Sequence, residues 1–128
     1  MEFKINEKMY QLKFGIKCIR ELDKFYKVDY QGMEFGMGVN LAFMNLNQYN
    51  PTALAQVITA AIAHEPSPPK IYQIDTAIEE YAVENDGLKS LFEEVLDELG
   101  KSPVAKDTLK TFKEKGKVDP EQEAQENQ

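Results

Sequence analysis

Cysteine and histidine, the usual ligands of transition metals and frequent catalytic residues, are nearly absent from this sequence. Its 128 residues include one cysteine, Cys18, one histidine, His64, and no tryptophan. A single cysteine excludes an intramolecular disulfide and favours a reducing compartment. We interpret Cys18 as a small buried hydrophobic residue, and His64 as a residue at a helix end that complements the helix dipole. A nucleophilic Cys18–His64 pair is the alternative that the sequence leaves open, although no motif marks it.

Metal, cofactor and nucleotide sites are not predicted either. Carboxylates lie three and four residues apart at Glu93, Glu94, Asp97 and Glu98. Helical carboxylate sites for metals use Glu-x-x-His pairs, and none of these acids has a histidine three residues later. Phosphate-binding glycine loops, zinc-ligand spacings and nucleophile elbows are missing. The sequence therefore predicts no catalytic residue, no metal and no cofactor, and we expect that the protein is not an enzyme.

Long apolar runs and an excess of positive charge are also missing. The longest apolar stretch, residues 57–63, includes Thr59 and is far shorter than the ~20 residues that a membrane span needs. No signal-peptide core follows Met1. The net charge of -7 argues against nucleic acid and against an anionic membrane as partners, because both require a basic surface. These features predict a soluble intracellular protein.

The charge that is present is distributed unevenly. Residues 75–98 contain nine acidic residues against Lys89 alone, whereas residues 101–117 contain six lysines against two acids. An acidic layer and a basic layer could pair between copies of the chain or with a partner. Two separately solvated faces are the simpler interpretation, because an exposed ion pair contributes only ~0–1 kcal/mol.

The N-terminal segment alternates apolar and polar residues around a short polar turn at residues 6–8. The alternating apolar residues are Phe3, Ile5, Tyr10, Leu12 and Phe14. This period of two predicts a β-hairpin, and an isolated hairpin is only marginally stable in water. We expect it to pack on an amphipathic helix that follows directly, with the apolar positions Ile16, Ile19, Leu22 and Tyr26.

The middle of the chain contains a glycine-rich segment and a strong helix start. Three glycines within residues 30–38 predict a loop that could include a short strand, followed by a short helix near residues 39–47. Asn50-Pro51 is typical of a helix N-terminus, because Asn caps it and the missing N–H of Pro costs nothing there. The helix predicted over residues 51–63 has many alanines and can pack closely, so we expect it to be central.

The start of the next helix is ambiguous. Ser67-Pro68 could cap it, or residues 71–74 could run extended before a capping box that begins at Thr76. The turn signal at residues 85–87 ends this helix.

The strongest helical periodicity in the chain follows. It is formed by Leu88, Leu91, Phe92, Val95, Leu96 and Leu99. Gly100 is expected to end this helix as a left-handed cap, and Ser102-Pro103 to begin a last helix with Val104, Leu109 and Phe112. The predicted fold class is mainly α with a small N-terminal β-hairpin (α+β), with about five to six helices. We expect one domain over residues 1–117 and a disordered acidic tail over residues 118–128.

One segment stands out as a candidate binding surface. Residues 33–44 contain three of the five methionines and two phenylalanines. Methionine adapts its shape and is frequent at permissive binding surfaces. The alternative is that these side chains fill the core beneath the hairpin. The predicted partner-binding residues are Met33, Phe35, Met37, Leu41, Phe43 and Met44.

Three stretches of the sequence together suggest a family. They are LKFGIKCIRELDKFY at residues 12–26, the small-residue helix after Asn50-Pro51, and LFEEVLDEL at residues 91–99 leading into Ser102-Pro103. In this order the chain resembles, from residue 1 to about residue 115, the tail assembly chaperones of long-tailed phages (siphophages) and prophages of Gram-positive bacteria.

The resemblance implies a helical, non-enzymatic protein that binds the tape measure protein, keeps it soluble and promotes assembly of the tail tube. Such proteins act in the cytoplasm of the bacterial host and leave before the virion matures. The family makes a shorter product and a frameshifted longer one, and this chain resembles the shorter product. Contact with the tail tube protein would then be made by the longer, frameshifted product. The family supplies no catalytic residues to transfer.

A different class of function is favoured only by the rows of carboxylates. An acidic mimic of nucleic acid could inhibit a DNA-binding protein by occupying its basic surface. Physical grounds support the chaperone independently of the resemblance. An amphipathic helical protein with adaptable apolar side chains and a strong net charge could cover apolar grooves and keep a complex soluble.

Overall fold

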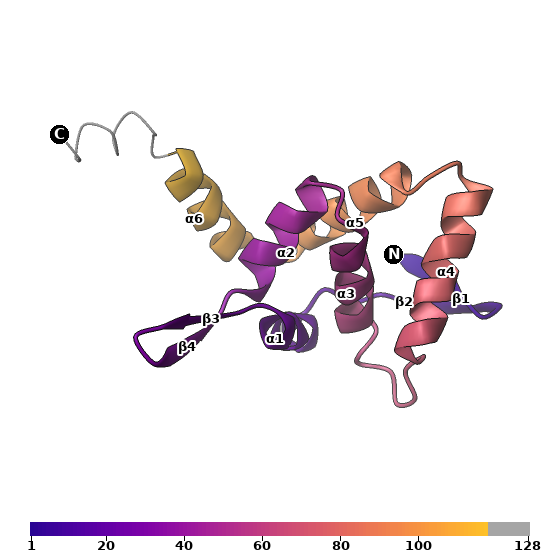
Figure 1. Ribbon diagram of the computed structural model, residues 1–128, viewed down its shortest axis with the longest axis horizontal. Coiled ribbons are helices and arrows are strands. Elements are labelled where there is room, and N and C mark those ends of the chain that lie inside the picture. Colours follow the sequence, from indigo (N-terminus) through magenta and orange to yellow (C-terminus); the bar gives the residue numbers. More distant parts are fainter. Residues whose placement is uncertain (118–128) are drawn as a thin grey trace.

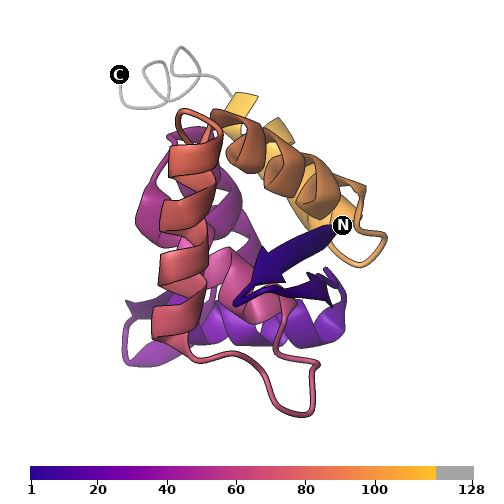
Figure 2. The same ribbon diagram turned by 90° about the vertical axis from the view of Figure 1, so that its right-hand side faces the viewer.

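The computed structural model describes residues 1–117, apart from the side chains of Phe35 and Lys117. The elements of this part are β1 (Glu2–Ile5), β2 (Lys8–Gln11), α1 (Ile16–Phe25), β3 (Lys27–Tyr30), β4 (Met33–Gly36), α2 (Gly38–Asn47), α3 (Pro51–Ala61), α4 (Ile71–Glu84), α5 (Lys89–Lys101) and α6 (Lys106–Lys117). Figure 1 shows their arrangement, and Figure 2 shows it from the side. The predicted mainly helical α+β class is confirmed. The predicted disordered tail, residues 118–128, lies outside the described residues.

The N-terminal hairpin forms as predicted, with Phe3 opposite Tyr10 in an antiparallel pair. Asn6 and Glu7 both have positive φ angles, 51° and 65°, as a tight two-residue turn requires. The expected support for the hairpin was wrong, however. Strand β1 packs on α4 rather than mainly on α1, and the ring of Phe3 lies 6.3 Å from that of Tyr81. Local sequence cannot reveal this, because α4 follows more than sixty residues later.

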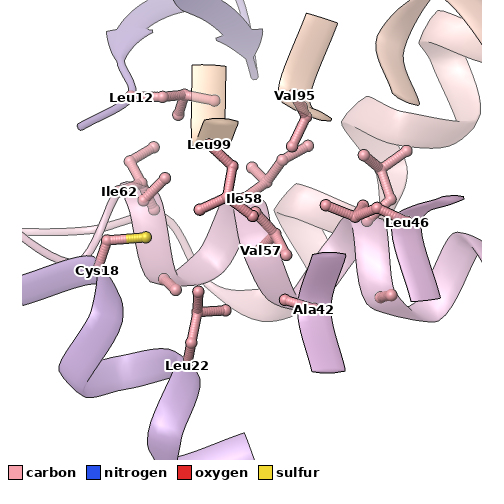
Figure 3. Packing of buried hydrophobic residues seen from close by; sticks show 14 of the residues in the cluster. Leu12, Cys18, Leu22, Ala42, Leu46, Val57, Ile58, Ile62, Val95 and Leu99 are labelled. Carbon is pink, nitrogen blue, oxygen red and sulfur yellow. The ribbon is translucent and has the colours of Figure 1, made fainter. Parts of the chain in front are cut away.

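Helix α3 forms the centre of the core, as its small residues predicted. Its side chains Leu54, Val57 and Ile58 are fully buried, and α1, α2 and α4 all pack against it. Figure 3 shows how residues from α1, α2, α3 and α5 meet in one cluster. Asn50 caps the helix as expected, because its side chain accepts hydrogen bonds from the N–H groups of Thr52 and Ala53 at 3.0 and 3.4 Å.

The apolar stripe predicted for the first helix was partly wrong. Ile16 is 55% exposed, whereas Cys18 and Leu22 are buried. Helix α1 begins at Ile16, so this residue lies at the edge of the body. The four-residue spacing of Cys18 and Leu22 places both on the face that meets α3.

Three predicted boundaries also need correction. Helix α4 begins at Ile71, at neither of the two predicted starts, because the Gln73 side chain accepts a hydrogen bond from the Lys70 N–H at 2.9 Å. Gly100 is no left-handed cap, since α5 continues through it to Lys101. Helix α6 begins at Lys106 rather than after Ser102, whose hydroxyl donates to the carbonyl of Phe14.

A second hairpin replaces the loop predicted around the glycines. Strands β3 and β4 pair antiparallel, and Gln31 and Gly32 form the turn with φ angles of 54° and 79°. All residues of β3 are exposed, and the hairpin projects from the helical body (Figure 1). Periodicity does not predict β3 because all four of its residues are exposed.

Within residues 1–117, no helix combines the length and apolar character needed to cross a membrane.

Candidate protein-binding surface

The predicted binding residues lie in β4, at the N-cap of α2 and within α2, and none of those whose side chains are described is fully buried. Met33 is 62% exposed and Met44 is 40% exposed. Met37, Leu41 and Phe43 are half-buried, while the side chain of Phe35 is outside the described part. The contribution of α2 to the core consists of other residues, namely Gly38, Val39, Ala42 and Leu46. We call residues 33–44 the methionine segment.

Helical geometry divides these side chains between two sides of α2. Leu41 and Met44 are three residues apart within α2, so they share one side, whereas Met37 is the N-cap that precedes the helix. Phe43 lies toward α6, where the Lys113 ammonium is 4.8 Å from the centre of its ring. This distance is typical of a cation–π contact. Helical spacing therefore places Leu41 and Met44 together on one side of α2 and Phe43 on another, while Met37 lines the groove next to α6.

Asp23, at the end of α1, holds the start of α2. Its carboxylate oxygen Oδ1 accepts a hydrogen bond from the Gly38 N–H at 2.8 Å, and the Met37 N–H donates to the carbonyl of Tyr26 at 2.8 Å. An N–H at a helix start has no partner within its own helix, so Asp23 acts as a cap from a distant element. The methionine segment is thereby anchored at the point where it enters α2.

The glycines of the segment are explained by this anchor. A Cβ atom on Gly38 would lie 2.6 Å from the backbone nitrogen of Asp23, and one on Gly36 would lie 2.6 Å from the Asp23 side chain. Neither glycine belongs to a phosphate-binding loop. Both permit close packing of the segment on α1.

Two exposed residues beside the segment were not predicted from the sequence. Tyr30 is 63% exposed and pairs with Met33 across the second hairpin, so their side chains share a face. Val28 is also exposed and lies two residues before Tyr30 on the same face. The alternation of Val28 and Tyr30 ahead of Gln31-Gly32 was the signal that could have predicted them.

A groove of about 550 Å³ runs between α2 and α6, next to the segment. Met37 and Phe112 contribute apolar surface to it, and Asp107 and Lys115 are its charged lining residues. Asn40 also lines the groove, and its buried Oδ1 has no hydrogen-bond partner among the described residues. The groove thus combines apolar surface with charged groups of both signs.

Cys18 and His64 do not have the properties of a nucleophilic pair. Cys18 is 1% exposed, and burial raises the pKa of its thiol to about 12. A thiol that stays protonated is a poor nucleophile. His64 lies three residues beyond the end of α3 at Ala61, and its Nε2 faces Glu65 Oε1 at 3.7 Å.

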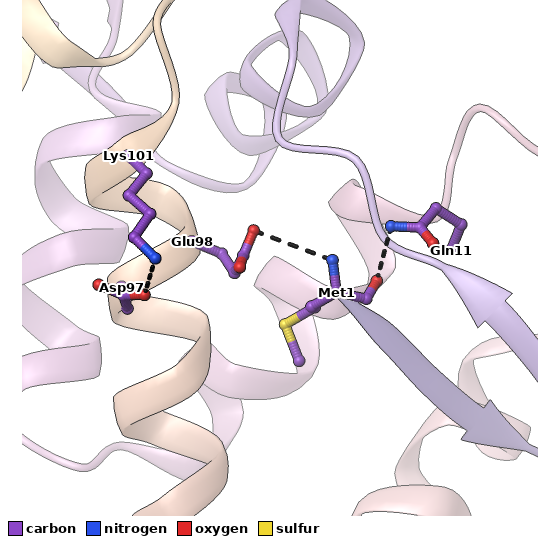
Figure 4. A network of polar contacts seen from close by, with 5 residues as sticks. All are labelled: Met1, Gln11, Asp97, Glu98 and Lys101. Carbon is purple, nitrogen blue, oxygen red and sulfur yellow. Dashed lines mark hydrogen bonds and ion pairs between the residues drawn. The ribbon is translucent and has the colours of Figure 1, made fainter.

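Most of the acidic row of α5 has cationic neighbours. Lys89 lies 4.0 Å from Glu93, Lys101 lies 2.7 Å from Asp97, and the amino group of Met1 lies 3.9 Å from Glu98. Figure 4 shows the last two contacts, together with the hydrogen bond from the Gln11 side chain to the Met1 carbonyl. The hydrogen bond with Asp97 raises the pKa of Lys101. Among the described residues, no group of three or more His, Cys, Asp or Glu side chains is arranged to hold a metal ion.

Comparison with known proteins identifies the family. No curated protein matches the chain, and neither does any solved structure. The family described as phage tail assembly chaperone protein, TAC, matches residues 2–114. This range includes both hairpins, α1 to α5 and most of α6. The resemblance inferred from residues 12–26, 51–63 and 91–103 is therefore confirmed at the level of the family. The chain belongs to the phage tail assembly chaperones.

Proposed function

We propose that this chaperone binds the tape measure protein of a long-tailed phage, keeps it soluble and promotes assembly of the tail tube around it. Its membership of the tail assembly chaperones supports protein partners in tail assembly. We propose the methionine segment as the binding surface because Met33 and Met44 are exposed on it and Asp23 anchors it. Contact with the tail tube protein through a longer, frameshifted form is part of the same proposal.

The chemistry of the segment suits a partner with many non-identical apolar grooves. Methionine is unbranched and polarizable, so it can adapt to grooves of different shapes. A rigid pocket would bind one groove well and miss the others, whereas surfaces that can repack bind several. The net charge of -7 would keep the resulting complex in solution.

The same proposal includes a non-enzymatic mechanism. The thiol of Cys18 is buried and protonated, and the carboxylates of α5 are largely paired with cations. Binding alone suffices for a chaperone that covers apolar surface. Cys18→Ala and His64→Ala should therefore leave the yield of soluble tape measure protein unchanged, and a loss of this yield in a folded variant would contradict the proposal.

The binding surface can be tested by co-expression with the tape measure protein. The double variant Met33→Gln/Met44→Gln should shift the tape measure protein into the insoluble fraction, because amides bind apolar grooves poorly. Both side chains are exposed, so the helical circular dichroism signal should not change. Met9→Gln is the matched control, since Met9 is exposed on the N-terminal hairpin.

The double variant and the control separate three results. Loss of soluble partner in the double variant alone supports the methionine segment. Unchanged solubility would contradict it and direct attention to the acidic row of α5. Unfolding of the double variant would contradict the exposed position on which the proposal rests.

The acidic mimic of nucleic acid is the weaker candidate. Three of the four carboxylates in the row of α5 have cations nearby, which reduces the negative field that such a mimic needs.

The proposal for the chaperone also includes a location in the host cytoplasm and outside the mature virion. Mass spectrometry of purified virions should accordingly detect no peptide of residues 1–117.

A further inference from the structure

Small side chains leave a groove between α3 and α4. Ala55 of α3 and Ala82 of α4 line it, together with Pro51 and Leu88, and its volume is about 380 Å³. Because an alanine has no atom beyond Cβ, it leaves space between two packed helices that a larger side chain would fill. The groove therefore has an apolar floor to which both helices contribute.

The groove continues into a larger hollow with aromatic walls. This hollow has a volume of about 600 Å³ and shares Pro51, Ala82 and Leu88 with the groove. Tyr49 and Phe92 also line it, and their rings meet edge to face with centres 5.3 Å apart. Tyr49 is 49% exposed, so much of its ring is accessible to a partner. We call the groove and the hollow together the α3–α4 groove.

The α3–α4 groove has a negatively charged edge on α4. Asp75 and Glu79 line it, are exposed, and lie four residues apart, so they share one side of the helix. None of the ion pairs within residues 1–117 includes either of them. Lys89 lines the hollow, but it already lies 4.0 Å from Glu93. The groove thus combines apolar surface with two carboxylates that no ion pair of the described residues neutralises.

We propose that the α3–α4 groove is a second docking surface, which binds an amphipathic helix of a partner protein with basic residues beside its apolar ones. The apolar floor and the aromatic walls would bury the apolar side chains of that helix. A lysine or arginine of the helix can lay its stem along the floor while its charged group reaches Asp75 or Glu79. The groove shares no residue with the methionine segment, so this inference does not rest on the proposed contact with the tape measure protein.

The charge of the groove also predicts which partners are rejected. Nucleic acid, anionic membranes and acidic helices carry the same sign of charge as Asp75 and Glu79. An uncharged apolar helix would cover both carboxylates without supplying a cation, and the loss of their hydration would oppose binding. Specificity therefore depends on the basic residues of the partner, while the apolar contacts supply affinity.

A synthetic peptide provides the first measurement. The probe is a fluorescein-labelled helix of about four turns, with leucines at helical spacing and lysines beside them. Its fluorescence anisotropy should rise on addition of the full chain at roughly 50 mM salt, and binding should weaken at roughly 500 mM. The same peptide with glutamates in place of the lysines should bind about tenfold more weakly or worse. Absence of binding by the lysine peptide, or equal binding of both peptides, would overturn the proposal.

Two variants then locate the binding site. Asp75→Asn/Glu79→Gln removes both charges at nearly constant size, and the affinity for the lysine peptide should fall about tenfold. Ala82→Met places a flexible apolar side chain in the groove, so it should weaken peptide binding although the charges remain. Circular dichroism should show both variants folded, because Asp75 and Glu79 are exposed and Ala82 is only partly buried. Full affinity in either folded variant would contradict the assignment of the groove.

A matched control separates the groove from general charge attraction. Glu80→Gln/Glu84→Gln makes the same change in charge at the same spacing of α4, but these exposed side chains line a hollow beside the N-terminal hairpin. This variant should bind the lysine peptide like the natural chain, and so should the double variant of the methionine segment. An equal loss in either control would overturn the proposal. So would occupation of the groove by a second copy, which would appear as self-association that only Asp75→Asn/Glu79→Gln abolishes.

Discussion

Gly38 lies where α1 and α2 approach most closely. A methyl group at this position would meet the backbone of Asp23 and Leu22 at 2.6 Å, and backbone atoms cannot move aside as a side chain can. The same contact supplies the hydrogen bond from the Gly38 N–H to Asp23. One residue without a side chain therefore determines how the methionine segment joins the core.

Gly38→Ala should lower the free energy of unfolding by about 1–3 kcal/mol, the usual cost of overpacking. The matched control is Gly100→Ala, because Gly100 lies within α5 and nothing lies within 4 Å of the added methyl group. That control should raise stability by about 0.5–1 kcal/mol through helix propensity. Urea denaturation measures both changes, and equal effects of the two substitutions would contradict the close contact at Gly38.

Cys18 should make stability depend on alkaline pH. Burial raises its pKa from 9.0 to about 12 in the folded chain. As the pH rises above about 9, the unfolded chain releases this proton while the folded chain keeps it, so stability decreases by up to about 1.4 kcal/mol per pH unit until the folded pKa is reached. Below the unfolded pKa both states hold the proton, and this contribution to the pH dependence vanishes.

Comparison with Cys18→Ala isolates this effect from the lysines and tyrosines that titrate in the same range. The variant loses stability at every pH because it leaves a cavity. Its decline between about pH 8 and about pH 10.5 should nevertheless be smaller than that of the natural chain. Chemical denaturation at the two pH values gives the difference, and identical declines would argue against a buried, protonated thiol.

At the scale of the element, the cap of α3 offers the clearest test. Asn50 accepts two hydrogen bonds from the first turn of the helix that forms the centre of the core. Asn50→Ala should cost about 1 kcal/mol, because these N–H groups lose their partner. Asn50→Ser should retain most of the stability, since the hydroxyl can accept in the same way. Thermal melts of both variants suffice, and equal losses would mean that capping is not the cause.

The elements also differ in how far their own sequence predicts them. Helix α3 was predictable because Asn50-Pro51 carries its own start signal, and α5 because its apolar residues follow a regular helical period. The start of α4 was not predictable from these signals, because its cap depends on Gln73 rather than on Ser67 or Thr76. A short strand was expected in the second hairpin, but the hairpin itself was not, because the residues of β3 are exposed and leave no apolar alternation on a core face.

For the whole molecule, we propose that residues 1–117 form one domain that does not need residues 118–128. The C-terminal segment has no apolar pattern after Val118. Deletion of residues 118–128 should therefore leave the melting temperature within experimental scatter. A loss above about 1 kcal/mol would contradict this proposal, because it would require the segment to contribute packing.

The sequence by itself determined the mainly helical α+β fold class, the N-terminal hairpin, the helices around residues 51–63 and 88–101, and the family. These features depend on neighbouring residues, since a cap or an apolar period acts over one or two turns. The family match over residues 2–114 agrees with what those local patterns indicated.

Only the tertiary structure decided which side chains of these elements are exposed. Met33 and Met44 are at the surface, and Gly38 is pressed against α1, because of where distant elements lie. The hydroxyl of Ser102 likewise donates a hydrogen bond to the carbonyl of Phe14, far away in the sequence, instead of capping the helix that follows it. The acidic α4 and the basic α6, which adjoin α5 in sequence, lie at opposite ends of the molecule (Figure 1). The physical reason is that burial and separation depend on all packing partners at once, whereas periodicity depends only on the residues within a segment.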